Sequence, residues 1–550
     1  MHEILEPFGP LSKSTIWTRL ADVYRGGLAA WDTVPATVTG NALVGDLFAG
    51  AVEAWLFDQG DAVDVAAPLY VVELGAGTGL FSHHFLTAVA RRRARGTLPH
   101  PRIVLVMCDQ SDAQIDEWSG TEALAAHARA GTLDFATYAV DEHGPPGPIV
   151  LKRGGQTLSS LTNPLVVVAN YFFDSIPTDA FRVRDGRIFE ARTRFVRTRE
   201  TPDFEGFQNE EKIVAIGADH YGDAALDSIL PAYARDKREA SVLMPIAALR
   251  CLQSLMQASD RRMLLLSIDK GITSGGRLDG WHKQPFVTHG GVFSYLVNFD
   301  ALRRYFEAND GAALCSSSDD RGLACCVGML PAPAASDGHL NRFFVNQIDS
   351  VDAFNANVSF AQAINAFPVA TQASQVEPVL DLVTRMRADP DAFAGAIYRT
   401  VGVLADAEKG VRSLARRLAA MAKENFLSPR FHNDVFYWSG RMHYALGDLD
   451  LARQDFETSV SRFAAKSQAH FFLGVLAEQR DDIDTASQHY ALHRALQPEC
   501  KATRAAIRRV RAKLRKRQEP APRGPGRGSR PGGGTSSGVA SAAVSSSASD

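Results

Sequence analysis

Four short runs of apolar residues in the first half of the chain predict the strands of a sheet. They cover residues 70–74, 103–108, 165–169 and 263–268. Each run is continuously apolar rather than alternating, which is typical of strands buried on both faces of a parallel sheet. Helical patterns separate the runs, so the order of elements favours an α/β fold with a mainly parallel sheet.

Shorter patterns add detail to this sheet. Residues 181–183 and 187–196 flank Asp185-Gly186, and this dipeptide favours the tight turn of a hairpin. Residues 312–330 contain two further extended runs, which predict an antiparallel pair at the edge of the sheet. Upstream, residues 11–60 show helical spacing and predict an N-terminal helical cap on the sheet.

From about residue 340 the pattern becomes helical and repeats itself. Three pairs of similar residues lie 34 positions apart: Gly440 and Gly474, Ala452 and Ala486, Phe456 and Tyr490. This is the period of the tetratricopeptide repeat (TPR), a helix–turn–helix unit. Two units are too few for a free-standing solenoid, so residues 376–425 are expected to add helices or a divergent unit. A helical bundle with accidental spacing is the alternative.

The patterns together divide the chain into four predicted parts. They are a helical cap over 1–68, an α/β domain over 69–335 with a hairpin and helical insertion around 181–260, a helical TPR-like domain over 340–515, and a tail over 516–550. The tail is basic and then rich in Ser, Gly and Ala. Such a composition buries too little apolar surface to offset the entropy of ordering, so disorder is expected.

Composition narrows the choice of partners and compartment. A net charge of -3 over 550 residues gives no global reason to expect nucleic acid or an anionic membrane as partner. Only residues 501–530, with twelve Lys or Arg, offer a local basic segment that could touch nucleic acid. The six cysteines lack C-x-x-C spacing, so neither a disulfide framework nor a metal site is expected. With no leader pattern and no apolar run near the about 20 residues of a membrane span, we expect a cytoplasmic protein.

The stretch VVELGAGTGLFS, residues 71–82, carries the clearest chemical signal. Glycines after a strand let the backbone turn tightly and let a ligand approach, while the following helix presents free N–H groups. The spacing G-x-G-x-G differs from the dinucleotide fingerprint G-x-G-x-x-G, so NAD or FAD is the weaker alternative. It resembles motif I of class I S-adenosyl-L-methionine (SAM)-dependent methyltransferases. The resemblance implies SAM contacts from Glu73, Gly75, Ala76, Gly77, Thr78 and Gly79.

Two further acidic residues are candidates for the same cofactor. Asp109 ends the second predicted strand, where a carboxylate can accept hydrogen bonds from both hydroxyls of a ribose. The alternative role for Asp109 is to cap the helix that follows, and both roles are compatible. Asp134 is expected to follow a third strand and to line the adenine pocket.

The segment after the predicted strand 165–169 is the expected acceptor side, because ligands bind at the carboxyl ends of strands in open α/β sheets. Its sequence ANYFFDSIPTDAF is similar to A-N-E-F-F-D-A-L-P-V-x-x-F of the MidA-like SAM-dependent methyltransferases. Mitochondrial members of that family are implicated in protein arginine methylation and complex I assembly. The segments GNALVGDLFAGAVEAWL, LLLSIDKG and HGGVFSYLVNFDALRRYF agree in order, so the resemblance covers roughly residues 30–330. It implies a Rossmann-like methyltransferase sheet.

The resemblance also implies roles for individual residues. Asn170, Tyr171 and Asp174 are the expected catalytic residues, and Phe173, Pro177, Asp269 and His289 the expected substrate contacts. Two positions depart from the family pattern: Tyr171 stands where the family has Glu, and Lys270 where it has Tyr. A guanidinium is best held by paired carboxylates, so the loss of one weakens arginine as the acceptor. An amide or amino nitrogen is the alternative, since Asn-x-x-aromatic resembles the N-P-P-Y/F loop.

The sequence therefore predicts a SAM-dependent methyltransferase that acts on a protein recruited by the TPR-like helices. A methyltransferase-like scaffold or assembly factor, which binds SAM without turnover, is the second hypothesis. No membrane partner is expected.

Overall fold

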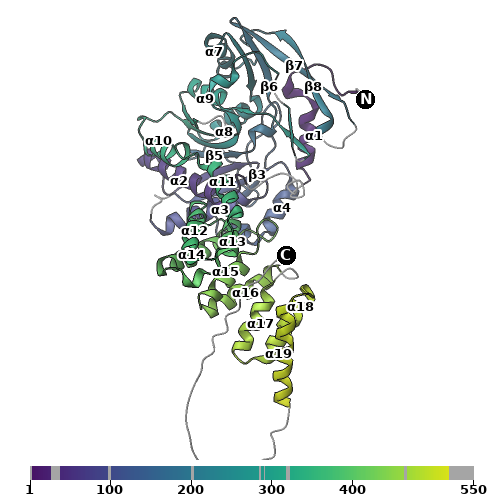
Figure 1. The fold of residues 1–550 in the computed structure, drawn as a ribbon. Helices are drawn as coiled ribbons and strands as arrows, with labels where there is room; N and C mark the ends of the chain where they lie inside the picture. The colour runs from purple at the N-terminus through teal and green to yellow at the C-terminus, as the bar shows by residue number, and fades with distance from the viewer. Residues whose placement is uncertain are drawn as a thin grey trace, which may run out of the picture. The chain divides into compact units, whose positions relative to one another are not determined.

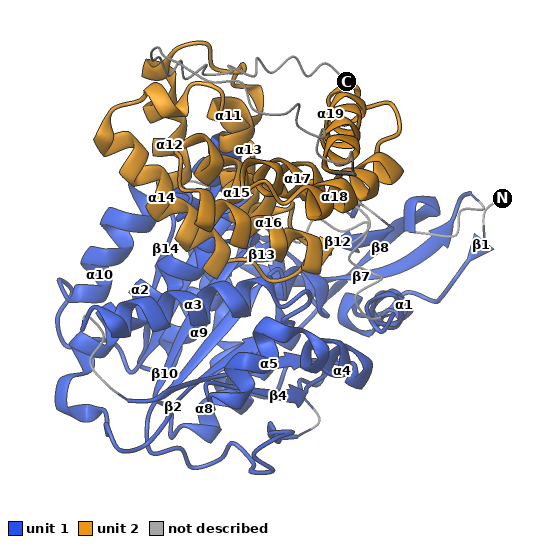
Figure 2. Ribbon diagram, turned by 90° about the horizontal axis from the view of Figure 1, so that it is seen from below, with its two compact units in different colours: residues 1–362, 385–389 blue, residues 363–384, 390–550 orange. Residues whose placement is uncertain are grey.

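A computed structural model describes residues 3–26, 38–96, 101–145, 147–199, 204–283, 286–289, 291–317, 322–463 and 468–518. The chain forms two compact units (Figure 2). Unit 1 comprises residues 1–362 and 385–389, and unit 2 comprises residues 363–384 and 390–550. The tail predicted over 516–550 lies outside the described residues from 519 onward.

The main sheet of unit 1 confirms the predicted α/β class. Its strand order is β14-β15-β10-β5-β2-β3-β4, and β13 pairs with the end of β10. The strands β4, β3, β2, β5 and β10 run parallel, and β15 runs antiparallel between β10 and β14. The bounds are β2 (Leu69–Leu74), β3 (Ile103–Asp109), β4 (Leu133–Thr137), β5 (Leu165–Asn170), β10 (Met263–Ile272), β13 (Val297–Asn298), β14 (Ala312–Cys315) and β15 (Leu323–Leu330).

The order of the strands reverses between β2 and β5. The chain adds β3 and β4 on one side of β2, then places β5 and β10 on the other. Such a reversal opens a crevice at the carboxyl ends of the central strands, which is where open α/β sheets bind ligands. The predicted edge pair over 312–330 is present, but only β14 lies at the edge, because β15 inserts beside β10.

Helices cover both faces of this sheet (Figure 1). They include α2 (Ala42–Gln59), α3 (Leu80–Ala94), α4 (Asp112–Gly120), α5 (Glu122–Arg129), α8 (Ile246–Ala258), α9 (Phe299–Ala308) and α10 (His339–Phe343). Helix α2 is buried along almost its whole length and packs against α3. The contact is close: a Cβ on Gly45 would lie 2.7 Å from the backbone of His84, so glycine is required there.

A second sheet is formed by the N-terminal strand and by four strands inserted between β5 and β10. It contains β1 (Glu3–Ile4), β6 (Asp179–Arg184), β7 (Arg187–Arg197), β8 (Phe207–Ala215) and β9 (Glu239–Met244), in the order β1-β7-β6-β9 with β8 beside β7. The predicted hairpin is confirmed: β6 and β7 pair antiparallel, and Asp185 and Gly186 both have positive φ angles. The helices α6 (Ala224–Asp227) and α7 (Ile229–Asp236) connect β8 to β9.

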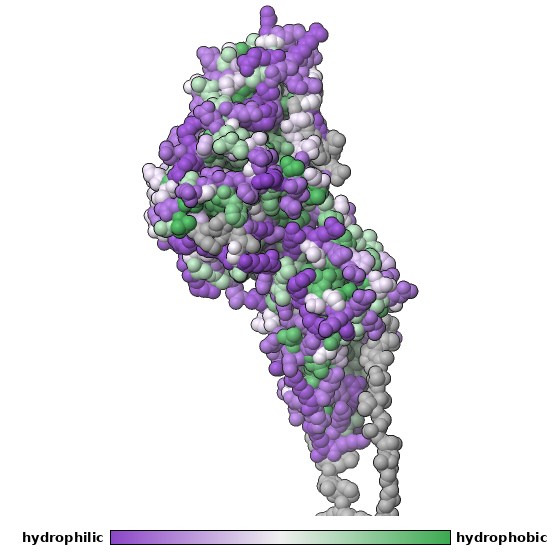
Figure 3. Space-filling view, turned by 90° about the vertical axis from the view of Figure 1, so that its left-hand side faces the viewer, coloured by the Kyte–Doolittle hydropathy of each residue, from purple (hydrophilic) through white to green (hydrophobic). Residues whose placement is uncertain are grey.

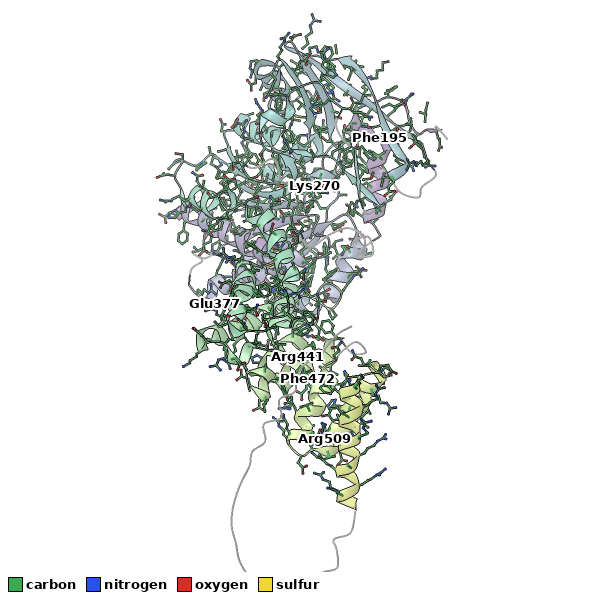
Figure 4. All side chains as sticks on the ribbon, viewed as in Figure 1. Phe195, Lys270, Glu377, Arg441, Phe472 and Arg509 are labelled. Atoms are coloured by element: carbon green, nitrogen blue, oxygen red, sulfur yellow. The ribbon has the colours of Figure 1, made fainter. Side chains whose placement is uncertain are left out.

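The N-terminal helices do not form one cap on the main sheet. Helix α1 (Thr15–Tyr24) packs on the inserted sheet, where Trp17 and Leu20 join a core with Phe195 and Phe293. Figure 4 labels Phe195 beside this helix. Of the N-terminal helices in the described residues, α2 is the one that covers the main sheet, through α3. The strong amphipathicity of α1 requires an apolar surface, and the aromatic face of the insertion provides it.

Unit 2 is helical throughout its described part. Its elements are α12 (Val376–Arg385), α13 (Pro390–Thr400), α14 (Lys409–Glu424), α15 (Val435–Ala445), α16 (Leu449–Phe463), α17 (Ala469–Gln479), α18 (Ile483–Leu496) and α19 (Lys501–Gln518); α11 (Ala353–Ala366) spans the boundary between the units. The further helices expected over 376–425 are therefore present.

The positions that repeat every 34 residues make equivalent contacts. A Cβ on Gly440 would lie 2.6 Å from the ring of Phe456, and a Cβ on Gly474 would lie 2.6 Å from the ring of Tyr490. Each glycine thus lets one helix approach the aromatic side chain of the next, in the pairs α15–α16 and α17–α18. This is the packing that the period predicts, while the assignment to the TPR class stays a prediction.

The surface of unit 2 combines an aromatic cluster with a basic helix. Arg441 lies 4.7 Å above the ring of Phe472, and Figure 4 labels both. On α19, Arg509 and Lys513 form ion pairs with Glu478 at 2.7 and 3.0 Å. Figure 3 shows a mainly hydrophilic surface at this end of unit 2. Part of the basic charge over 501–518 is therefore neutralised within the chain. Among the described helices of both units, none combines the length and apolar character of a membrane span.

Candidate active site

The loop after β2 has a backbone that only glycine adopts readily. Gly75, Gly77 and Gly79 have φ angles of 65°, 52° and 76°, and Gly79 precedes α3 as its N-cap. A Cβ on Gly75 would lie 2.8 Å from the ring of Phe172, which follows β5. The loop therefore lies directly against the segment after β5, and a ligand can approach its backbone closely. Thr78 is buried, and its hydroxyl accepts a hydrogen bond from Leu80 N at 3.4 Å.

The Glu73 side chain lies behind this loop and is shielded from solvent. Its side chain is buried, and its Oε2 accepts a hydrogen bond from Ser82 Oγ of α3. Burial raises the pKa of Glu73 to about 8. At neutral pH the carboxyl is therefore largely protonated. A cationic amino group nearby would lower that pKa again, because opposite charge favours the ionised form.

A cavity of about 440 Å³ opens beside the loop. This is within the usual range for a small-molecule site. Its lining comes from α1 and the turn before it, and from residues that follow β2, β3, β4 and β5. These include Ser12, Lys13, Tyr24, Arg25, Gly75, Asp109, Gln110, Tyr138, Asp141, Glu142, Tyr171, Phe172, Ser175 and Pro177. The cavity therefore lies at the crevice that the reversal of strand order creates.

Asp109 is the predicted cofactor carboxylate that faces this cavity. It is the last residue of β3, and its Oδ1 accepts a hydrogen bond from Gln110 N at 2.7 Å. Burial raises the pKa of Asp109 to about 6, against the opposing effect of backbone N–H groups. At neutral pH it is ionised, which suits hydrogen bonds from ribose hydroxyls.

Asp134 does not occupy the predicted position, and this prediction is corrected. It is the second residue of β4 rather than a residue after the strand. Its Oδ1 accepts a hydrogen bond from Arg153 N, and its Oδ2 accepts one from Gly154 N, both at 2.9 Å. Because β4 continues to Thr137, the residues that reach the cavity from this strand begin at Tyr138.

Tyr171 is the first residue after β5 and lines the cavity. Its φ angle is 48°, which is uncommon for a residue with a side chain. Its backbone N–H donates to Ile268 O at 2.9 Å, and Lys270 Nζ lies 5.7 Å from the centre of its ring. The hydrogen bond to β10 holds this strained backbone, and Tyr171 lines the cavity. Burial, and then Asp269 and Asp174, raise the pKa of the Tyr171 phenol.

Asp174 and Asp269 form a buried pair of carboxyl groups at the ends of β5 and β10. Asp174 N donates to Asp269 Oδ2 at 3.1 Å, and Ser175 Oγ donates to Asp174 Oδ1 at 2.7 Å. Burial raises the pKa of both groups, and the charge of Asp174 raises that of Asp269 further. Lys270 opposes this shift in both. The two side chains also form a hydrogen bond with each other, and ionisation of both carboxyls together is therefore disfavoured.

Tyr24 of α1 is a site residue that sequence reasoning missed. Burial raises the pKa of its phenol, followed by the charge of Asp174, and Ser175 forms a hydrogen bond with it. Tyr24 lies far from every motif in the sequence, at the end of a helix whose pattern indicates only packing. Only the tertiary structure places Tyr24 close to Asp174 and Asp269.

The remaining predicted residues take different positions. Asn170 Oδ1 accepts a hydrogen bond from Ile268 N at 3.2 Å, and its buried Nδ2 has no partner among the described residues. In an N-P-P-Y/F loop the Asn side-chain oxygen would orient the acceptor nitrogen. Here Asn170 Oδ1 already accepts a hydrogen bond from the backbone. Phe173 is in the core, and Pro177 lines the cavity. His289 ends β11 (Val287–His289), and its side chain lies outside the described part of the chain.

The fold and the cavity define an α/β protein with a small-molecule site at the reversal of its strand order. Residues 51–311 match a family model described as "Putative S-adenosyl-L-methionine-dependent methyltransferase". Over these residues the chain is similar to that family, and the match supports a SAM-dependent methyltransferase domain in unit 1 with SAM as its cofactor. The methyltransferase resemblance seen in the sequence is confirmed. No curated protein matches the chain.

Two solved structures from Burkholderia thailandensis are similar to part of the chain. The first is an uncharacterized protein, 18% identical, that covers 60% of this chain and 91% of its own length with a TM-score of 0.37. The second contains S-adenosyl-homocysteine, is 16% identical, and covers 62% of this chain and 98% of its own length with a TM-score of 0.34.

The residues around the loop fit the cofactor that the family implies. Gly75 and Asp109 both line the cavity, and the ring of Phe172 occupies the space that a side chain at Gly75 would need. Glu73 lies behind the loop and is not among the described residues that line the cavity. SAM, when bound, supplies a methyl group on a sulfonium that is already activated for transfer. The protein must then bind, align and desolvate the reactants.

Proposed function

We propose that this chain transfers a methyl group from SAM to a protein acceptor that enters the cavity between α1 and the segment after β5. One observation carries the proposal. Gly75 and Asp109, on the cofactor side, and Tyr171, Ser175 and Pro177, on the acceptor side, line a single cavity. Cofactor and acceptor can therefore meet in one cavity, as direct transfer requires.

A protein acceptor is supported by the helical unit. Arrays of paired helices present extended surfaces that bind peptides or helices, and unit 2 has the close helix pairs typical of such arrays. The proposal also includes a cytoplasmic location, which the six free thiols support because reducing conditions preserve them.

The second candidate is a scaffold that binds SAM without turnover. The departures at Tyr171 and Lys270 favour it, because both alter the acceptor side and leave the cofactor loop intact. The two candidates differ in one observable, the transfer of a methyl group.

Two measurements on the full chain test the proposal. Calorimetric titration with SAM should show binding that is lost in Gly77→Arg, because an arginine side chain at a φ angle of 52° would distort the loop. Incubation of a protein extract with methyl-labelled SAM should then label protein, and Asp174→Asn should abolish labelling while SAM still binds. Binding without labelling would establish the scaffold, and absence of binding would exclude both candidates.

A further inference from the structure

The last described helix of unit 2, α19, is basic over its whole length. Its residues 501–518 include nine Lys or Arg and no Asp or Glu. The helix packs against α18 (Figure 1), and Ala506 and Val510 are buried in a core shared with Ile483 and Tyr490. The apolar face of α19 is therefore used within unit 2, and the basic side chains occupy the remaining surface.

Most of these basic side chains form two rows, one on each side of the apolar face. Residues three or four positions apart lie on the same face of a helix. The paired row is spaced by four and consists of Arg509, Lys513 and Arg517. The open row is longer, is spaced by three and four, and consists of Lys501, Arg504, Arg508, Arg511 and Arg515. The two rows therefore face different surroundings.

The paired row is neutralised by carboxylates of unit 2. The side-chain nitrogens of Arg509 and Lys513 lie 2.7 and 3.0 Å from the Glu478 carboxylate. Arg517 forms an ion pair with Asp481 at 2.6 Å. Figure 4 labels Arg509 on the helix. Because these charges are balanced within the unit, the paired row offers little to a partner.

The open row keeps most of its charge. Within it, Arg504 forms an ion pair with Glu499 at 3.0 Å. The other four residues are exposed and form no ion pair with any residue that the structure describes: Lys501, Arg508, Arg511 and Arg515. Lys516, which lies between the two rows, is exposed as well. Positive charge is therefore concentrated along one side of the helix.

The length of the open row indicates an extended partner. Lys501 and Arg515 are 14 positions apart, which corresponds to about 21 Å along the helix axis. The four exposed cations follow one another at intervals of about 5 to 10 Å. A small anion reaches one or two of them, whereas a polyanion with regularly repeated charges reaches all four.

A lipid surface does not suit this helix. A helix that binds at a membrane interface inserts a free apolar face between the lipid headgroups. In α19 the apolar residues Ile507, Val510 and Leu514 pack within unit 2 instead. The polyanion is therefore a macromolecule in solution.

The composition of the row favours phosphate over carboxylate. Three of its four exposed cations are arginines, whose planar guanidinium binds phosphate oxygens in bidentate fashion and always carries its charge. The chain continues with Arg523, Arg527 and Arg530 among Gly and Pro. Segments rich in Arg and Gly occur in proteins that bind single-stranded nucleic acid.

We propose that the open row of α19 binds the phosphate backbone of a nucleic acid. The contacts are charge-assisted hydrogen bonds from guanidinium and ammonium groups to phosphate oxygens. Helix α19 contains no aromatic residue on which a base could stack, so the binding is independent of base sequence. This function goes beyond methyl transfer and does not depend on it. RNA and DNA share the phosphate chemistry, and the test separates them.

Fluorescence anisotropy measures the binding. The full chain is titrated against labelled single-stranded RNA, single-stranded DNA and duplex DNA of equal length and mixed sequence, at several salt concentrations. At least one probe should bind, with an affinity that falls as salt rises, because each phosphate contact releases a counterion. A preference identifies the kind of nucleic acid, and equal affinity indicates recognition of the backbone alone. No binding of any probe, or tighter binding of a poly-glutamate peptide or of anionic lipid vesicles, would overturn the proposal.

Two variants with the same loss of charge test the row itself. Arg515→Gln removes a contact of the open row and should make the plot of log affinity against log salt shallower by about 0.7 for a single strand. Arg517→Gln removes one charge from the paired row and should leave this slope unchanged. Both positions are exposed, and thermal unfolding like that of the parent protein checks that both variants fold. Equal slopes for the two variants would contradict the assignment to the open row.

A combined variant gives a larger effect. Arg508→Gln, Arg511→Gln and Arg515→Gln together should reduce the slope by about 2 and weaken binding by at least about tenfold at moderate salt. Calorimetric titration with SAM should be unchanged, because the row lies in unit 2 and the cofactor loop in unit 1. Nucleic-acid affinity equal to that of the parent protein would overturn the proposal.

Discussion

The sulfur atoms of Cys315 and Cys326 lie 3.5 Å apart, on residues that face each other directly across β14 and β15. Ser316 N donates to Cys325 O in the neighbouring pair, so Cys315 and Cys326 occupy a position without ladder hydrogen bonds. Opposed Cα atoms are closest at such positions, about 4.5 Å, which is compatible with a disulfide.

Oxidised glutathione should therefore convert this pair to a disulfide, accepting two electrons and releasing two glutathione thiols. The cross-link closes a short loop and should stabilise the fold by about 3 kcal/mol on a chain-entropy basis. Counting free thiols before and after oxidation, with mass analysis of peptides, measures the reaction. Cys325→Ser should still react, since residue 325 points to the other face of the strand. Continued loss of two thiols in Cys326→Ser would contradict the prediction.

Glu73→Gln should change stability in a pH-dependent way. The folded-state pKa of about 8 exceeds the ordinary value, so the folded protein binds more protons than the unfolded chain between about pH 4.5 and 8. Stability that depends on Glu73 is therefore present at low pH and is lost as pH rises toward 8. The glutamine mimics the protonated form and avoids this loss.

We expect Glu73→Gln to unfold at a higher temperature than the parent protein at pH 8, with no gain at pH 4.5. Thermal unfolding at the two pH values measures the effect. An equal change in unfolding temperature at both pH values would show that the Glu73 carboxyl is not the source.

Gly75→Ala should weaken SAM binding by more than tenfold. The new Cβ would lie 2.8 Å from Phe172 and would also face an unfavourable φ angle of 65°. Gly155→Ala is a matched control, because its φ angle is 68° but nothing lies within 4 Å of the added atom. The control carries only the backbone cost, about 1 kcal/mol. Similar SAM affinity in the two variants would contradict the close approach of the loop to Phe172.

Gly440→Ala should destabilise unit 2, although alanine in a helix interior is normally better than glycine by about 1 kcal/mol. The reason is the 2.6 Å approach of the added Cβ to Phe456. Gly410→Ala provides the contrast, since it lies in α14 with nothing within 4 Å. Thermal unfolding followed by circular dichroism should show a lower transition for Gly440→Ala and an equal or higher one for Gly410→Ala. The same sign of change in both would refute the packing argument.

The sequence predicted those parts of the fold in which local pattern and tertiary structure agree. The four buried strands are continuous apolar runs, and the Asp185-Gly186 turn needs only local backbone preferences, so both could be found from the sequence. Asp134 was misplaced because its strand, LDFAT, mixes polar and apolar residues and gives no clear end. A shift of four residues was enough to move the cavity lining from Asp134 to Tyr138.

The acceptor side could be predicted only in part. Tyr171 and Asp174 lie in one motif, and their proximity follows from their spacing. The pairing of Asp174 with Asp269 depends on the parallel register of β5 and β10, in which Asn170 faces Ile268. Tyr24 depends on the docking of α1 onto a sheet inserted much later in the chain. Such contacts follow from the topology, which a local pattern does not contain.

The attachment of α1 to the inserted sheet divides the cavity between two pieces of protein that lie far apart in the sequence. The cofactor half is built by the central strands, and the wall carrying Tyr24 is held by the insertion. Substitutions in the aromatic core beneath α1 should therefore change the acceptor specificity. The residues that hold the cofactor would stay unaltered. Changes of substrate within such an enzyme would then originate at positions that touch neither reactant.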